Sequence, residues 1–249
     1  MVMTGNHPLL GARLAVRPAG TGSVGRRTAC LTGGPGVRAA CPSTLPDVDR
    51  FATLDVILVR HAMPVAPDAP EWAERYDERP LSEQGQRQAD ELAFELDAYG
   101  ISAVYSSPYP RALQTVQPTA ARHELEVQVL PDLRERLQQL GPRDDWHEVM
   151  ERSWADFEYA LPGTESNREA QRRGTAVLDL LRVRHADGGR LLIGSHGNLI
   201  SLILHALEPG IDIAFAEAMP MPALYHLQHD GVGWRVMGGF GFTEIAERS

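Results

Sequence analysis

The chain has 249 residues, 43% of them hydrophobic and 23% charged, a composition that fits one or two globular domains with a sizeable core. Its formal net charge is −9; residues 1–50 carry six arginines against Asp47 and Asp49, a net of +4, so residues 51–249 carry −13. An acidic body argues against nucleic acid and anionic membrane as partners, because binding to either depends on basic residues that neutralise phosphate charge.

All 24 basic residues are arginine. The lack of lysine excludes Schiff-base chemistry, lysine-bound pyridoxal phosphate and the lysine of a nucleotide-binding phosphate loop. The two cysteines, Cys30 and Cys41, do not make a disulfide framework, and the glycine-rich run between them is a poor secretory signal. We therefore expect a cytoplasmic protein.

Residues 1–50 are rich in glycine, proline, alanine and arginine and show almost no periodicity. This composition predicts a low-complexity, disordered extension, followed by a folded domain at residues 51–249. A gene start placed too far upstream would explain the same composition equally well.

Strands and helices alternate from residue 54 onward. Strands are expected at residues 55–59, 101–107, 126–130 and 190–196, with a closing pair at 223–230 and 234–240. Helices are expected at residues 81–100, from Pro110 (with Pro118 kinking or ending it), at 165–184 and at 198–207, whereas 136–163 looks irregular. Apolar strands alternating with helices predict an α/β fold of three layers, α/β/α, around a mostly parallel sheet.

Polar side chains follow four of these strands. Arg60 and His61 follow the first, Arg111 the second, Glu135 the third and His196 the fourth. Taken singly, each has an ordinary structural explanation. Because ligand sites gather at the carboxyl ends of parallel strands, these residues are expected to meet. Two guanidinium forks beside two imidazoles would repel one another without an anion, so the expected guest is a phosphoryl group.

Six blocks of sequence resemble the histidine phosphatase superfamily, in its branch 1, with a phosphoglycerate-mutase-like fold. They are, in order, LVRHA, PLSEQGQRQADEL, VYSSPYPRALQT, PDLRER, PGTESNREAQRR and LLIGSHGNLI. The resemblance runs from about Leu54 to residue 240. Departures are Ala62 for the usual glycine after the histidine, and Pro64 and Pro67 at two positions downstream.

The resemblance implies a role for each residue at the strand ends. His61 would be the nucleophile that takes the phosphoryl group, and Glu135 would protonate the leaving alkoxide and later activate water. Three side chains would hold the phosphoryl oxygens, and backbone amides at the start of the last helix would add donors. The three side chains are those of Arg60, Arg111 and His196; the amides are those near Gly197 and Asn198.

The sequence favours a metal-independent phosphatase acting on small phosphomonoesters, with no cofactor. A cofactor-dependent phosphoglycerate-type mutase and a non-catalytic phospho-ligand binder are alternatives, and the substrate and the oligomeric state are not indicated. No metal site is expected: His226 and His229, three apart in an expected strand, would point to opposite faces.

Overall fold

A computed structural model describes residues 52–66, 75–137 and 145–239 of the chain. The expected extension at residues 1–50 lies outside the described residues, as do Pro67 and the cysteines, so those expectations stay predictions. None of the helices in the described part is both long and apolar enough to span a membrane.

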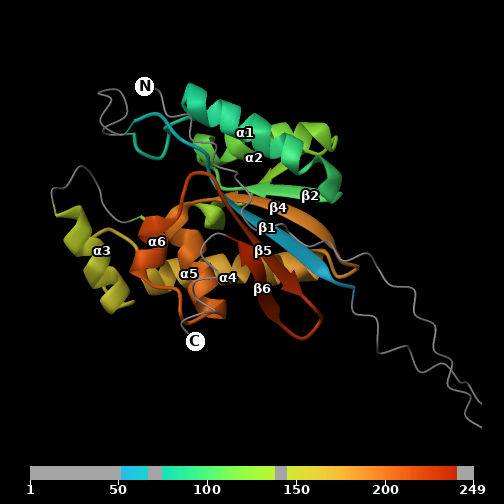
Figure 1. Ribbon diagram of the computed structural model, residues 1–249. Helices are drawn as coiled ribbons and strands as arrows, with labels where there is room; N and C mark the ends of the chain where they lie inside the picture. Colours follow the sequence, from blue (N-terminus) through green and yellow to red (C-terminus); the bar gives the residue numbers. More distant parts are fainter. Residues whose placement is uncertain (1–51, 67–74, 138–144, 240–249) are drawn as a thin grey trace, which may run out of the picture. The chain divides into compact units, whose positions relative to one another are not determined.

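Six strands form one mixed sheet in the order β3-β2-β4-β1-β5-β6 (Figure 1). Strands β1 to β4 pair in parallel, and β5 and β6 are antiparallel additions at one edge. The mostly parallel sheet and the closing hairpin are confirmed. The strands are β1 (Leu54–Arg60), β2 (Ala103–Ser106), β3 (Val127–Val129), β4 (Gly189–Ser195), β5 (Ala223–His229) and β6 (Trp234–Gly239).

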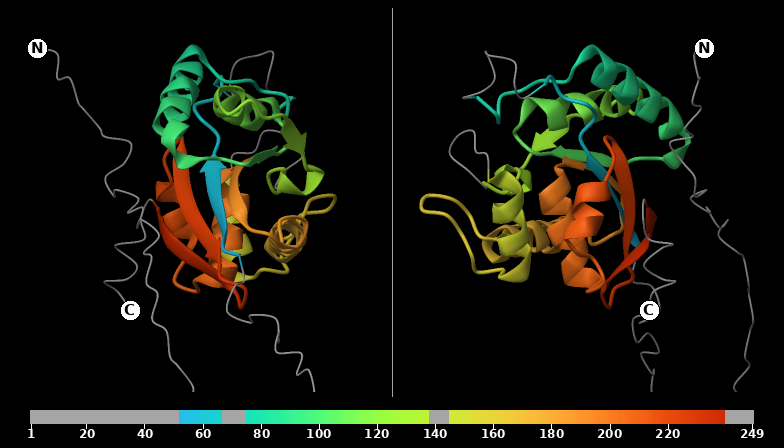
Figure 2. Two further views of the ribbon diagram at one scale, coloured as in Figure 1. Left: turned by 90° about the vertical axis from the view of Figure 1, so that its right-hand side faces the viewer. Right: turned by 60° about the vertical axis from the view of Figure 1, so that its left-hand side comes forward.

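Helices cover both faces of the sheet, which gives the expected three layers (Figure 2). Helices α1 and α2 lie on one face, and α4 and α5 on the other, while α3 contacts α6 (Figure 1). The α-helices are α1 (Glu83–Glu95), α2 (Pro110–Arg122), α3 (Trp146–Ala155), α4 (Asn167–Arg184), α5 (Gly197–Leu207) and α6 (Ile213–Ala218), with short 3-10 turns at Asp97–Tyr99 and Pro131–Leu133.

The alternation of side chains along β1 connects the two layers of core. Val56 and Leu58 belong to the larger apolar cluster with α4 and α5, whereas Ile57 and Val59 belong to the cluster with α1 and α2. Successive side chains of a strand point to opposite faces, so a strand covered on both faces is apolar throughout. This explains why the run before His61 shows no polar alternation.

The starts of α1 and α4 follow from their capping residues. The Ser82 hydroxyl accepts the amide of Gly85, and the Ser166 hydroxyl accepts the amide of Glu169, whose carboxylate in turn accepts the amide of Ser166. Each cap satisfies amides that the first helical turn leaves without partners. The first helix was expected to reach Gly100; it ends at Glu95, and a 3-10 turn leads to Gly100 in the left-handed region, φ 61°.

Two expectations about the helices are wrong. Residues 136–163 are not irregular throughout, because α3 forms there and buries Val149, Met150 and Ser153. Its acidic and aromatic residues conceal that short apolar face. Pro118 was expected to kink or end α2, and it does not end it, because the helix continues to Arg122. Buried Val116 and Ala120 pack this helix into the apolar cluster on that face, which offsets the hydrogen bond lost at the proline. The short α6 was not expected at all.

Candidate active site

Strand register brings the two histidines together. Arg60 is paired with Ser195 across β1 and β4, so the next residues, His61 and His196, leave the sheet side by side at its carboxyl edge. The amide of His61 donates to the carbonyl of Ser195 at 3.0 Å. The two imidazole centroids lie 5.2 Å apart. The expectation that these distant segments meet at one edge is therefore correct.

His61 is held in one orientation by contacts at both ring nitrogens. Its Nδ1 lies 2.8 Å from the carbonyl oxygen of Ala62, and its Nε2 lies 3.3 Å from Nε of Arg111, which donates to it. A carbonyl only accepts and a guanidinium only donates, so these partners assign the proton to Nδ1 and the lone pair to Nε2. Burial, followed by the charge of Arg111, lowers the pKa of His61 well below its ordinary value. A neutral, nucleophilic Nε2 results.

His196 is fully buried beside this ring. Its Nε2 lies 2.7 Å from the hydroxyl of Ser107, and the Tyr109 ring lies 5.0 Å away, centroid to centroid. Burial is the main reason that the pKa of His196 is well below its ordinary value, and Arg111 and His61 lower it further. Ser107 comes directly after β2, so a third parallel strand end contributes to the site.

Two arginines border the histidines. Arg111 is 0% exposed; its Nη1 donates to the carbonyl of Tyr76 at 2.9 Å. Arg60 donates through Nη1 to the carbonyl of Met219. Its guanidinium lies over Gly197, where an added Cβ would come within 3.0 Å of Cζ and Nε. Burial lowers the pKa of both guanidinium groups, and the nearby carboxylate of Glu135 opposes this for each. A side chain at 197 would therefore require the Arg60 guanidinium to shift.

Four buried nitrogen atoms at this edge have no hydrogen-bond partner in the described part of the chain. They are Nε of Arg60, Nη2 of Arg111, Nδ1 of His196 and Nδ2 of Asn198. A buried polar atom without a partner costs about 1–3 kcal/mol. Arg111 donates to His61 and the His196 ring lies beside it. Unpartnered donors of the amide and guanidinium groups could donate hydrogen bonds to an oxyanion.

Glu135 lies at the amino end of α5 rather than free in the pocket. Its Oε1 accepts the amides of Arg136 at 2.8 Å and Leu199 at 3.0 Å, and its Oε2 accepts the amide of Asn198 at 3.1 Å. The sequence assigned the Asn198 amide to the phosphoryl group; in the structure that amide donates to Glu135. Any contact from Asn198 to an oxyanion would therefore come from its side-chain Nδ2.

Several supporting residues were not found from the sequence. The Thr115 hydroxyl accepts the amide of Ala62 at 2.9 Å and donates to the carbonyl of Arg111 at 2.7 Å. Gln88 accepts the amide of Met63 and donates to the carbonyl of Met221. These side chains fix the backbone after His61 from two different helices. The one available signal was the position of Thr115, one helical turn after Arg111.

On α3, the indole Nε1 of Trp154 donates to Oδ1 of Asn198 at 3.3 Å. This contact places the carbonyl of the Asn198 amide toward α3 and its Nδ2 away from it. Helix α3 therefore contacts the site through the side chain of Trp154.

Residues 56–238 match the family model described as histidine phosphatase superfamily (branch 1). The chain belongs to this superfamily. The signature arginine and histidine, Arg60 and His61, fall inside the matched region, and so do Arg111, Glu135 and His196. The family expected from the six sequence blocks is confirmed.

Known relatives agree with the fold. Protein Rv0525 of Mycobacterium tuberculosis is 39% identical over 127 residues, which cover 47% of this chain and 60% of that protein. The mycobacterial glucosyl-3-phosphoglycerate phosphatase Rv2419c superposes with a TM-score of 0.59 at 21% identity, covering 74% of this chain and 97% of that one. A phosphoglycerate mutase from Bacillus anthracis gives 0.62 at 17% identity, covering 79% and 97%. At these identities the superpositions establish the phosphoglycerate-mutase-like fold.

Proposed function

We propose that this member of the superfamily is a metal-independent phosphatase that hydrolyses small phosphomonoesters through a phosphohistidine on His61. The observation that carries the proposal is the state of His61: a buried, neutral imidazole whose Nε2 lone pair lies against Arg111. A histidine that only bound an anion would serve better as a protonated imidazolium.

In the first step, Nε2 of His61 forms a bond to phosphorus while the bond from phosphorus to the leaving oxygen breaks. The leaving alkoxide takes a proton from the Glu135 carboxyl group. In the second step, a water oxygen forms a bond to phosphorus while the bond from phosphorus to Nε2 of His61 breaks. The water gives a proton to Glu135, inorganic phosphate leaves, and the neutral imidazole is restored. Arg60, Arg111 and His196 would stabilise the charge on the three equatorial oxygens in both steps.

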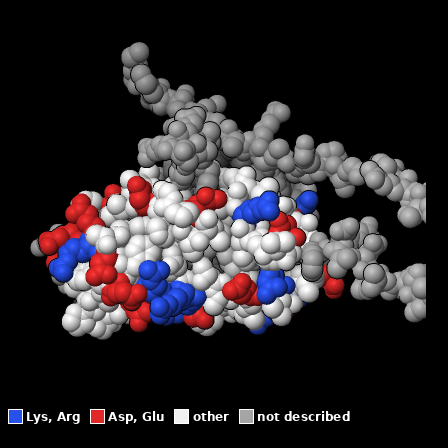
Figure 3. All heavy atoms as spheres, turned by 90° about the horizontal axis from the view of Figure 1, so that it is seen from below, with Lys and Arg blue, Asp and Glu red and all other residues white. Residues whose placement is uncertain are grey.

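Two further observations support a small substrate and a hydrolase. Acidic and basic side chains are interspersed on the face shown in Figure 3, which offers no extended basic surface there for a nucleic acid. The structural neighbours include a phosphatase named for a small phosphorylated sugar acid. They also include a phosphoglycerate mutase, so phosphoryl return to substrate is the second candidate.

Trapping of the labelled protein tests the proposal, with an alkaline detergent quench because phosphohistidine is stable to alkali. Labelled substrate mixed with the protein in excess EDTA should give acid-labile labelled protein, and His61→Ala should give none. His147→Ala, which removes a 66% exposed imidazole from α3, is the matched control and should label like wild type. No label in wild type would refute the phosphatase and support a binder. Conversion of 3-phosphoglycerate with 2,3-bisphosphoglycerate, without release of phosphate, would identify a mutase.

A further inference from the structure

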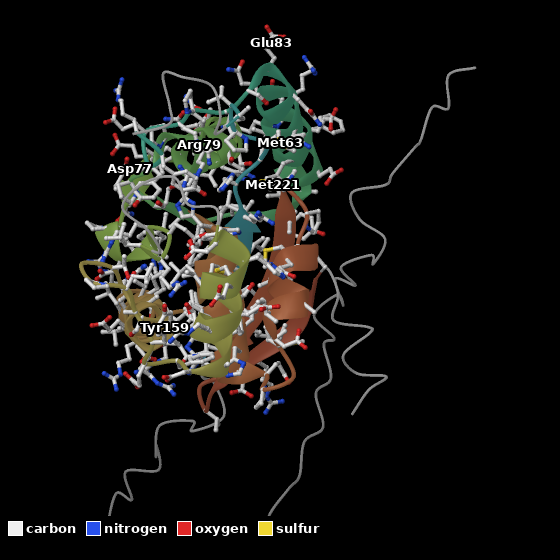
Figure 4. The ribbon with its side chains drawn as sticks, turned by 90° about the vertical axis from the view of Figure 1, so that its left-hand side faces the viewer. Met63, Asp77, Arg79, Glu83, Tyr159 and Met221 are labelled. Atoms are coloured by element: carbon white, nitrogen blue, oxygen red, sulfur yellow. The ribbon has the colours of Figure 1, made fainter. Side chains whose placement is uncertain are left out.

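Besides Arg60 and Arg111, the buried Arg79 lies beside the site and has no part in the proposed mechanism. Arg79 is only 4% exposed. Its Nη1 donates to the carbonyl of Val65 at 3.0 Å, its Nε to that of Tyr76 at 3.5 Å, and its Cζ lies 4.2 Å from the centroid of the Tyr76 ring. In the view of Figure 4, Arg79 and Asp77 lie in the part of the molecule toward α1, and Tyr159 lies toward the opposite end.

No carboxylate of the described residues makes an ion pair with Arg79. Glu78, the adjacent acid, pairs with Arg75 instead. The Nη2 of Arg79 also has no hydrogen-bond partner within the described ranges. It is not one of the fully buried atoms without a partner, so a ligand could reach it. A largely buried guanidinium without a paired carboxylate is unfavourable, so an anion bound at the open Nη2 would offset this cost.

Arg79 and Arg111 are neighbours. Both donate to the same carbonyl oxygen, that of Tyr76, and both stack on its ring, with Cζ 4.2 Å and 5.0 Å from the centroid. Two cations at such a distance repel one another. The ring of Tyr76, 50% exposed, covers the pair from the solvent side.

Arg79 lies outside the group that would hold the transferred phosphoryl. The charges that lower the pKa of His61 are, in decreasing order, Arg111, Arg60 and Arg79. Arg79 is not among the charges that perturb His196. Its contacts with Tyr76, which it shares with Arg111, place it on the Arg111 side of the pocket.

We propose that Arg79 and Tyr76 form a subsite for a second anionic group, a carboxylate or a phosphate, on the leaving part of the substrate. The subsite rests on the proposed function, since it takes a phosphomonoester held by Arg111 as its starting point. The two carbonyl contacts of Arg79 tie the loop at Val65 to the segment at Tyr76, but neutral donors would suffice for that. The retained positive charge, with one free donor, is what points to an anion.

Matched pairs of substrates test the subsite in the wild-type protein. Initial rates would be measured for 3-phosphoglycerate against glycerol 3-phosphate, which differ by a carboxylate. Fructose 1,6-bisphosphate against fructose 6-phosphate tests a second phosphate. We expect kcat/KM to be higher, by about tenfold or more, for the member with the second anionic group in at least one pair. The pair that shows this preference identifies the group. No preference in either pair would refute the subsite.

Variants assign the preference to Arg79. Arg79→Gln should abolish the ratio within the responding pair, and Arg79→Lys, which keeps a cation, should restore part of it. Arg235→Gln, which removes an exposed arginine from β6, should leave the ratio unchanged. If Arg79 only connects two loops, Arg79→Gln should lower kcat/KM equally for both substrates of a pair and leave their ratio unchanged. That result would refute the proposal. If Arg79→Gln does not fold, Arg79→Lys and the wild-type ratios decide.

The subsite and the proposed function fail in different ways. Absence of turnover and of protein labelling would reject the phosphatase; calorimetric binding of 3-phosphoglycerate against glycerol 3-phosphate would then test the subsite alone. Labelling and turnover without any preference for a second anion would reject the subsite and keep the phosphatase.

Discussion

Thr115→Val removes one hydroxyl that connects the backbone after His61 to helix α2. Thr115 is 0% exposed on α2, accepts the Ala62 amide at 2.9 Å and donates to the Arg111 carbonyl at 2.7 Å. Valine has nearly the same shape, so no cavity forms, but the amide of Ala62 is left buried without an acceptor. The Arg111 carbonyl keeps its bond within the helix.

The expected cost follows from that single amide. A buried donor without a partner costs about 1–3 kcal/mol, so we expect the free energy of unfolding to fall by about 2 kcal/mol, or roughly 30-fold in the equilibrium constant. The carbonyl of Ala62 also accepts from Nδ1 of His61. A shift of this residue should therefore lower kcat for a nitrophenyl phosphate as well.

Helix α2 supplies a matched control one turn later. Thr119 is also 0% exposed, but its hydroxyl has no hydrogen-bond partner in the described part of the chain. Thr119→Val should be neutral or stabilising, because it removes a buried polar atom that makes no bond. Urea denaturation of both variants and wild type measures the difference. If Thr115→Val were no less stable than Thr119→Val, the bridge from α2 to Ala62 would have no energetic importance.

Three further predictions concern the pocket itself. The folded-state pKa of His61 and of His196 is lowered, so the unfolded chain binds more protons than the folded one below about pH 6.5. The contribution of these groups to the free energy of unfolding should be complete above that pH and decrease as the pH falls below it. Denaturation curves that do not change between about pH 7.5 and 5 would contradict this. Gly197→Ala should lower kcat/KM about tenfold to a hundredfold by displacing Arg60, whereas Gly233→Ala, with open space around its Cβ, should not. Glu135→Gln should slow alkyl phosphates more than nitrophenyl phosphates in steady-state assays; an equal loss on both would argue that the carboxylate only caps α5.

Much of the fold followed from local pattern. The strand before His61 is apolar throughout because it is covered on both faces, and the serine caps of α1 and α4 act within three residues of themselves. Such signals involve residues close together in the chain, so they can be recognised from the sequence. Helix α3 was not predicted because only Val149, Met150 and Ser153 are buried. Three such positions among acidic neighbours are too few to show a helical period.

The candidate site divides in the same way. Arg60, His61, Arg111 and His196 were identified from strand ends and motif, and the structure brings them to one edge of the sheet. The bond between Glu135 and the α5 amides, and the bridge from Thr115 to Ala62, span 63 and 53 positions in sequence. No periodicity reports a contact across such a separation.

The sequence by itself determined the alternation of elements, the family and the side chains able to hold and attack a phosphoryl group, because each depends on residue type and short-range order. Only the tertiary structure decided which nitrogen of His61 carries the lone pair and which amides donate to Glu135. It also decided that Arg79 lies next to Arg111 and forms no ion pair with a carboxylate of the described residues. Hydrogen-bond direction and charge environment depend on which groups meet in space, and here those groups come from separate strands, helices and loops.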